Sequence, residues 1–100
     1  MSTLVVRYRP RVDTAAENQA LVEAVFDRLR TDEPDGIAYA CLRLDDGTFV
    51  HIATITAEPN PLLELPAFTA FASTLAERCG PGDGPHAAPA TLVGNYRLLT

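Results

Sequence analysis

The sequence contains no tryptophan and no lysine, and only two of its 100 residues are cysteines. Cys41 and Cys79 form no CxxC pair, and a small secreted scaffold needs a denser set of cysteines. We therefore expect two free, buried thiols. His51 and His86 do not complete a metal-binding spacing with the cysteines, so we expect neither a metal nor another cofactor.

Long hydrophobic runs are absent too, and none approaches the roughly 20 residues of a membrane-spanning helix. At the N-terminus a charged stretch follows a short apolar one, which is the reverse of a secretory signal. The net charge of -5 and a pI near 4.8 argue against nucleic-acid binding. The length suits a single domain, residues 1–100, which we expect to be cytoplasmic.

The first third of the chain predicts a strand followed by a helix. Residues 3–9 alternate between two faces before Pro10 interrupts the strand. Thr14 and Glu17 have the spacing of a capping box, and apolar residues then recur at helical spacing as far as Arg30. One strand face carries Leu4, Val6 and Tyr8, and the other carries Val5, Arg7 and Arg9.

Residues 36–56 predict a hairpin, in which the loop length decides which residues pair. A two-residue turn places Leu42 opposite His51, whereas a three-residue loop with Gly47 in the left-handed conformation places Cys41 there. The three-residue loop separates the faces more cleanly and is the one predicted. One face then carries Ala40, Leu42, Leu44, Val50 and Ile52, and the other carries Tyr39, Cys41, Arg43, Phe49, His51 and Ala53.

The second half of the chain predicts helical segments and a final strand. Asn60 followed by Pro61 favours a helix start, and Pro66 separates a short turn from a longer helix that runs to Cys79. Three glycines and three prolines predict a loop over residues 80–90. Residues 91–99 alternate, which predicts the last strand.

The order strand, helix, strand, strand, helix, strand predicts an α+β, ferredoxin-like fold, with two helices on one face of a four-stranded antiparallel sheet. We expect Val50 and Ile52 to face the helices, so that His51 faces away from them. The opposite face is too apolar for water, which predicts a homodimer whose sheets pack face to face as a β-barrel. Its predicted apolar residues are Val5, Phe49, Ala53, Val93 and Leu99.

Several segments together resemble the dimeric α/β barrel superfamily, which contains the antibiotic-biosynthesis-type monooxygenases. The likeness is carried by the strand VVRYR, the hairpin CLRLDDGTFVHIATI, the segment NPLLELPAFTAFASTLAER and the final VGNYRLL. It covers nearly the whole chain. It implies a ferredoxin-like homodimer that binds a small molecule and acts as a cofactor-independent monooxygenase, or as a non-catalytic ligand-binding or stress-associated protein.

The resemblance does not supply the catalytic residues. Members that degrade haem or oxidise polyketide quinols generally use an asparagine with a tryptophan and a histidine or arginine. Tryptophan is absent here, and the first strand has Arg7 and Tyr8 where a haem-degrading member has asparagine. No residue of the family's machinery is therefore carried over, and bound haem is not expected.

The candidate site consequently rests on the residues themselves. His51 is the best candidate catalytic residue, because an imidazole with an ordinary pKa near 6.5 suits a base or a hydrogen-bond donor. The alternative is a structural histidine at the dimer interface. Cys41 opposite His51 is either a thiolate partner or an inert buried thiol.

Basic residues predict the chemistry of the ligand. The strand arginines are expected on the face that carries His51, with no strand carboxylate beside them, which favours a small anionic molecule. An aromatic molecule is the second candidate. The predicted ligand-binding residues are His51, Arg7, Tyr39, Arg43, Asn95 and Arg97.

Overall fold

A computed structural model describes residues 2–98 of the chain. Within them, the strands are β1 (Ser2–Tyr8), β2 (Ile37–Arg43), β3 (Phe49–Ile55) and β4 (His86–Ala90). The helices are α1 (Ala15–Asp32), α2 (Pro66–Ser73) and α3 (Leu75–Arg78), with 3-10 turns η1 (Val12–Thr14) and η2 (Pro61–Glu64). None of these helices is long and apolar enough to cross a membrane.

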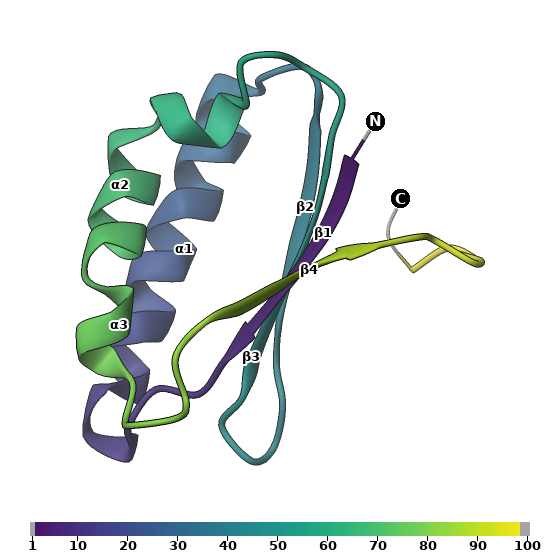
Figure 1. The fold of residues 1–100 in the computed structure, drawn as a ribbon. Helices are drawn as coiled ribbons and strands as arrows, with labels where there is room; N and C mark the ends of the chain where they lie inside the picture. Colours follow the sequence, from purple (N-terminus) through teal and green to yellow (C-terminus); the bar gives the residue numbers. More distant parts are fainter. Residues whose placement is uncertain (1, 99–100) are drawn as a thin grey trace.

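The strands form one antiparallel sheet in the order β2-β3-β1-β4, and the helices cover one of its faces (Figure 1). This arrangement confirms the predicted ferredoxin-like α+β fold. The core lies between the sheet and the helices, where Tyr8 and Phe49 of the strands meet Val25 of α1 and Phe71 of α2.

The β2–β3 hairpin has the predicted three-residue loop. Cys41 pairs with His51 and Leu42 with Val50. Gly47 has a φ of 91°, a left-handed conformation that glycine adopts without the steric penalty of a Cβ atom. The hairpin register could be derived from local sequence because the loop chemistry fixes it.

The prediction of which face lies under the helices is wrong. Phe49 and His51 are buried against the helices, whereas Ile52, which pairs with Val5, lies on the opposite side of the sheet. Alternation separates the two sets of side chains but does not say which set meets the helices. Burying the aromatic rings removes more apolar surface from water, and His51 joins them because its ring nitrogens find hydrogen-bond partners.

We call the sheet face turned away from the helices the open face. It carries Val5 and Arg7 of β1, Ala40 and Leu42 of β2, and Val50 and Ile52 of β3. Of the residues predicted to make this face apolar, Val5 lies on it. The others differ: Phe49 and Ala53 are buried under the helices, Val93 belongs to the segment after β4, and Leu99 lies outside the described residues.

The predicted capping box does not form. The Thr14 hydroxyl donates to the backbone carbonyls of Arg78, at 2.7 Å, and Arg11, at 3.2 Å, so it ties the start of α1 to the end of α3. The predicted cap of the later segment is confirmed, because the Asn60 side chain accepts the backbone N–H of Leu62 at 3.0 Å. The longer predicted helix is broken at Thr74 into α2 and α3.

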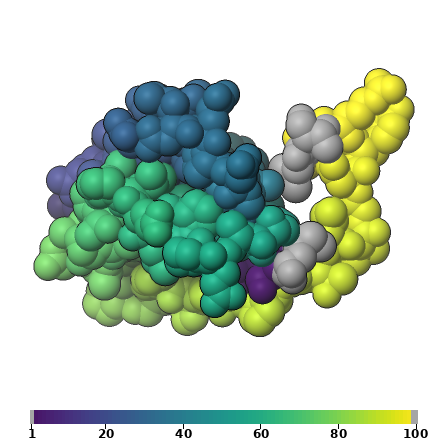
Figure 2. Space-filling model, turned by 90° about the horizontal axis from the view of Figure 1, so that it is seen from above, coloured from purple at the N-terminus to yellow at the C-terminus, as the bar shows by residue number. Residues whose placement is uncertain are grey.

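The last strand lies earlier than predicted. β4 occupies residues 86–90, inside the segment predicted as a loop, and residues 91–98 have no regular secondary structure. β4 is an edge strand that pairs with β1 alone, where Pro89 can be accommodated because one side of the strand needs no ladder partner. The segment after it projects from the body of the molecule and leaves Val93 97% exposed (Figures 1 and 2).

Candidate functional site

A cavity of about 180 Å³ lies between the sheet and the helices. β1, β2 and β3 form one wall, and η2, α2 and α3 form the other. Most lining side chains are apolar, among them Leu4, Leu62, Phe68, Phe71 and Leu75. The polar lining residues are Tyr8, Tyr39, His51 and Asn60. An apolar cavity with a few convergent polar groups is the usual form of a small-molecule site.

His51 is the centre of the polar end. Its side chain is 5% exposed, and its ring lies 5.3 Å from the ring of Phe71. The Tyr8 hydroxyl lies 2.8 Å from Nε2, and the Tyr39 hydroxyl lies 2.5 Å from Nδ1. Burial disfavours the charged imidazolium and lowers the pKa of His51 from 6.5 to about 4, so the ring is neutral at pH 7.

A continuous chain of side-chain hydrogen bonds leads from Arg78 of α3 to His51 and on to Tyr39, and we call it the hydrogen-bond string. Arg78 Nε donates to Asn18 Oδ1 at 3.0 Å, and Asn18 Nδ2 donates to the Tyr8 hydroxyl at 2.9 Å. Because the Tyr8 oxygen accepts from Asn18, its own hydrogen is available to His51 Nε2. The neutral ring then carries its proton on Nδ1 and donates it to the Tyr39 oxygen.

Tyr39 therefore ends the string. Its oxygen accepts from His51, and its own hydroxyl hydrogen has no acceptor among the side chains of residues 2–98. Tyr39 also lines the cavity. Burial raises the pKa of Tyr39, which keeps the hydroxyl protonated and able to donate to a ligand.

Arg78 begins the string and is itself buried, with 2% of its surface exposed. It donates to the Phe71 carbonyl at 2.8 Å and to Thr74, and its guanidinium lies 5.5 Å from the centre of the Phe71 ring. No aspartate or glutamate of the described chain forms an ion pair with it. A buried cation without a carboxylate favours negative charge nearby. For Tyr8, burial raises the pKa, while the Asn18 hydrogen bond and the Arg78 charge act in the opposite direction.

Cys41 is the remaining reactive group at this end. Its sulfur lies 3.5 Å from His51 Nε2. Burial raises the pKa of Cys41 to about 11, so the group is a thiol at neutral pH and not a thiolate nucleophile. Cys79 is also a free cysteine, and the described residues contain no cluster of metal-binding side chains.

The structure brings together His51 and Tyr39 of the predicted ligand-binding set and separates the others from them. Arg43 lies beside α1, where it donates to Gln19 at 2.7 Å and stacks on Phe49. Asn95 and Arg97 belong to the segment after β4. The prediction that the strand arginines gather beside His51 is therefore wrong. It assumed that His51 faces away from the helices and that residues 91–99 form the last strand.

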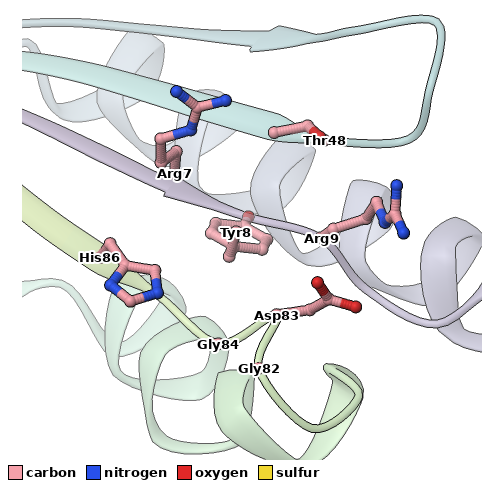
Figure 3. A pocket seen from close by; sticks show the side chains of 8 residues that line it. All are labelled: Arg7, Tyr8, Arg9, Thr48, Gly82, Asp83, Gly84 and His86. Atoms are coloured by element: carbon pink, nitrogen blue, oxygen red, sulfur yellow. The ribbon is translucent and has the colours of Figure 1, made fainter.

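Arg7 lies at a second hollow of about 250 Å³, beside the end of β1 (Figure 3). Arg9 and His86 also line it, and the loop that carries Asp83 forms the other side. Asp46 offsets part of the two guanidinium charges, since Arg9 and Arg7 are among the causes that lower the pKa of Asp46 after its hydrogen bonds with Thr48. Binding of an anion by Arg7 stays a prediction.

Sequence reasoning missed Tyr8, Asn18 and Arg78 as members of the site. One signal was available for Asn18, an amide placed one helical turn before Val22 on the buried stripe of α1. A polar residue on an apolar stripe needs a buried partner. Nothing local indicated that this partner would be Tyr8, ten residues away, or Arg78, sixty residues away.

Comparisons with known proteins address the fold. No family model matches the chain. No curated protein matches it either. Solved structures do: Rv0793 from Mycobacterium tuberculosis is similar over 94% of this chain and 96% of its own, with a TM-score of 0.71 and 18% identity.

Two further solved structures are similar to this chain over most of its length. A dimeric ferredoxin-like protein of unknown function from Jannaschia sp. CCS1 has a TM-score of 0.67 and 15% identity over 91% of this chain and 98% of its own. A variant of SnoaB, a cofactor-independent oxygenase from Streptomyces nogalater, has a TM-score of 0.62 and 21% identity over 96% of both chains. Another similar structure is described as an antibiotic biosynthesis monooxygenase.

The chain has the fold of these proteins. The resemblance found in the sequence is confirmed at this level, since antibiotic biosynthesis monooxygenases and a cofactor-independent oxygenase are among its structural neighbours. At 15–21% identity the likeness shows the fold alone.

Proposed function

We propose that the cavity binds a hydroxylated aromatic molecule and that the protein oxygenates it with O₂ and no cofactor. The observation that carries this proposal is that Tyr39 and His51, joined between hydroxyl and Nδ1 at the end of the hydrogen-bond string, both line one apolar cavity. A ring hydroxyl of the ligand accepts from Tyr39, while Phe71 and the other apolar walls pack on the ring. Neighbours described as oxygenases support the assignment.

The string assists the reaction by favouring the ionised form of the ring hydroxyl. His51, with a pKa of about 4, is too weak a base to take the proton, so the proton is released to solvent on binding. The remaining oxyanion is stabilised by the Tyr39 hydroxyl, which is polarised through His51, Tyr8 and Asn18 by the charge of Arg78.

An ionised dihydroxylated ring is an electron donor to O₂. One electron passes to O₂, and the ring radical and superoxide form a carbon–oxygen bond to give a ring peroxide, which takes a proton back from solvent. The O–O bond of this hydroperoxide then breaks with loss of water, which leaves a new carbonyl oxygen on the ring. In total the substrate loses four electrons and O₂ gains four. One oxygen atom enters the product and the other leaves as water. No residue of the chain is oxidised.

Oxygen uptake tests this function. Purified protein is mixed with a panel of dihydroxybenzenes and dihydroxynaphthalenes in an oxygen electrode, and products are analysed by mass spectrometry after use of isotopically labelled O₂. We expect uptake above the uncatalysed rate, with one labelled atom in the product. Tyr39→Phe should lower kcat by about a hundredfold, whereas Tyr96→Phe, which changes no cavity residue, should not.

Non-catalytic ligand binding, including a stress-associated role, is the alternative. It predicts saturable binding of the same molecules without oxygen uptake above background. Saturable binding together with unchanged oxygen consumption would therefore replace the oxygenase proposal by the binding one.

Self-association is part of the proposed function. Val5 and Ile52 lie on the open face, and the segment after β4 leaves a groove of about 520 Å³ beside Ile52, Leu92 and Leu98. Leu42 is 49% exposed on the same face. A second copy packed sheet to sheet would remove this apolar surface from water, as predicted from the sequence. The description of the Jannaschia protein as dimeric supports self-association.

A further inference from the structure

We infer that the ligand of the cavity is a single-ring phenol or hydroquinone without a carboxylate or phosphate substituent, and that Leu75 and Phe71 exclude larger ring systems. This inference rests on the proposed function, because it takes for granted that a hydroxylated aromatic molecule binds beside Tyr39. It adds the size and charge of that molecule, which neither the fold nor the structural neighbours specify.

The volume of the cavity limits the size of the ligand. At about 180 Å³ it is close to the roughly 150 Å³ of an engineered protein cavity that holds benzene. It lies well below the roughly 300–1,000 Å³ of sites for drug-sized ligands. One aromatic ring with its hydroxyl groups fits this space, and two fused rings require the walls to move.

Phe71 is a wall that cannot readily move. Its ring contacts the rings of Tyr8, His51 and Phe68 at centroid distances of 6.2, 5.3 and 6.0 Å. Arg78 covers it and binds its backbone carbonyl. A rotation of Phe71 would disturb the same residues that hold His51, so this side of the cavity is fixed by the hydrogen-bond string itself.

Leu75 closes the cavity from α3 and is 7% exposed. It takes no part in the string, so shortening its side chain enlarges the cavity and leaves the polar end intact. Leu65 offers a matched control, because it is the same residue type, is equally buried at 7% exposed and belongs to the same core without lining the cavity.

The residues that line the cavity also limit which charged groups the ligand can carry. No charged side chain of the described chain lines the cavity, and its polar groups are the two tyrosines, His51 and Asn60. A carboxylate or phosphate elsewhere on the ring would be buried against apolar walls without a cation, which is strongly unfavourable, whereas the ring oxygen beside Tyr39 accepts a hydrogen bond from that hydroxyl. One ring hydroxyl has Tyr39 as its partner, and Asn60 is a further polar residue of the lining.

The test measures binding under nitrogen, so that no turnover intervenes. Hydroquinone, 1,4-dihydroxynaphthalene and 2,5-dihydroxybenzoate are titrated by calorimetry into the full-length protein and into its Leu75→Ala and Leu65→Ala variants. We expect the wild type to bind hydroquinone at least about tenfold more tightly than either other compound. Leu75→Ala should bring dihydroxynaphthalene within about threefold of hydroquinone, whereas Leu65→Ala should keep the wild-type preference.

The outcomes separate this inference from the proposed function. Equal affinity of the wild type for one and two rings, or for the carboxylate, overturns the inference and leaves the oxygenase proposal standing. Tight hydroquinone binding without oxygen uptake in air supports the inference and overturns the oxygenase proposal. Absence of binding by all three compounds, with the protein folded by circular dichroism, overturns both.

Discussion

The Nε2 atom of His51 lies 2.8 Å from the hydroxyl of Tyr8, on a neighbouring strand and under the helices. This contact joins the imidazole to Asn18 of α1 and, through it, to Arg78 of α3. The sheet and both helical segments are therefore connected by one buried polar string that passes through the candidate site. Each of the following predictions changes one part of that string or of the open face.

Stability should fall as the pH is lowered through the range in which His51 titrates. The pKa of this residue is about 4 in the folded protein and ordinarily 6.5, so between these values the unfolded chain binds a proton that the folded chain does not. Unfolding is then favoured by low pH. We expect a loss of about 3 kcal/mol between pH 7 and pH 4 from this group, measured by urea unfolding.

A His51→Gln variant provides the control for this pH dependence. It removes the titrating group, so its stability should change less over the same range than that of the wild type. Parallel pH dependences for the two proteins would contradict the assignment of the effect to His51.

Tyr8→Phe should destabilise the protein by about 1–3 kcal/mol, because it leaves the Asn18 amide and His51 Nε2 without their shared partner inside the core. The ring itself and its packing on Phe49 are retained. Chemical unfolding measures the difference, with the exposed Tyr96→Phe as the reference substitution. A change no larger than that of the reference would mean that water replaces the hydroxyl.

Arg78 should act as a positioning residue through its charge. Arg78→Met removes the cation that favours the ionised ligand, so the pH dependence of oxygen uptake should move to higher pH by about one unit. Arg78→Lys retains the charge and should stay close to the wild-type profile. A purely structural role would instead lower the amount of folded protein in both variants without moving the profile.

Leu42→Glu should separate a dimer into monomers, because it places a charge among the apolar side chains of the open face, where Leu42 is 49% exposed. We expect sedimentation of the wild type at twice the chain mass of 10.8 kDa and of the variant at the chain mass. Leu63→Glu, an exposed change on η2, should leave the dimer intact. A wild-type monomer at micromolar concentration would contradict face-to-face packing.

The sequence by itself determined the order of the elements, the register of the β2–β3 hairpin and the Asn60 cap. These features depend on residues a few positions apart: the loop chemistry around Gly47, the alternation of the strands and the Asn60-Pro61 pair. Interactions of this range are fixed before the chain is packed, which is why local reasoning recovers them.

Only the tertiary structure decided which strand face is buried, where the last strand lies and which residues surround His51. Alternation is symmetric between the two faces, and the choice depends on how well whole faces pack against helices that lie far away in the sequence. Residues 86–90 form β4 because they pair with the free edge of β1, although residues 91–99 alternate more regularly in the sequence. Asn18 and Arg78 are connected to His51 through Tyr8 only in the folded chain, because the hydrogen bonds that join these residues span separations that no local pattern encodes.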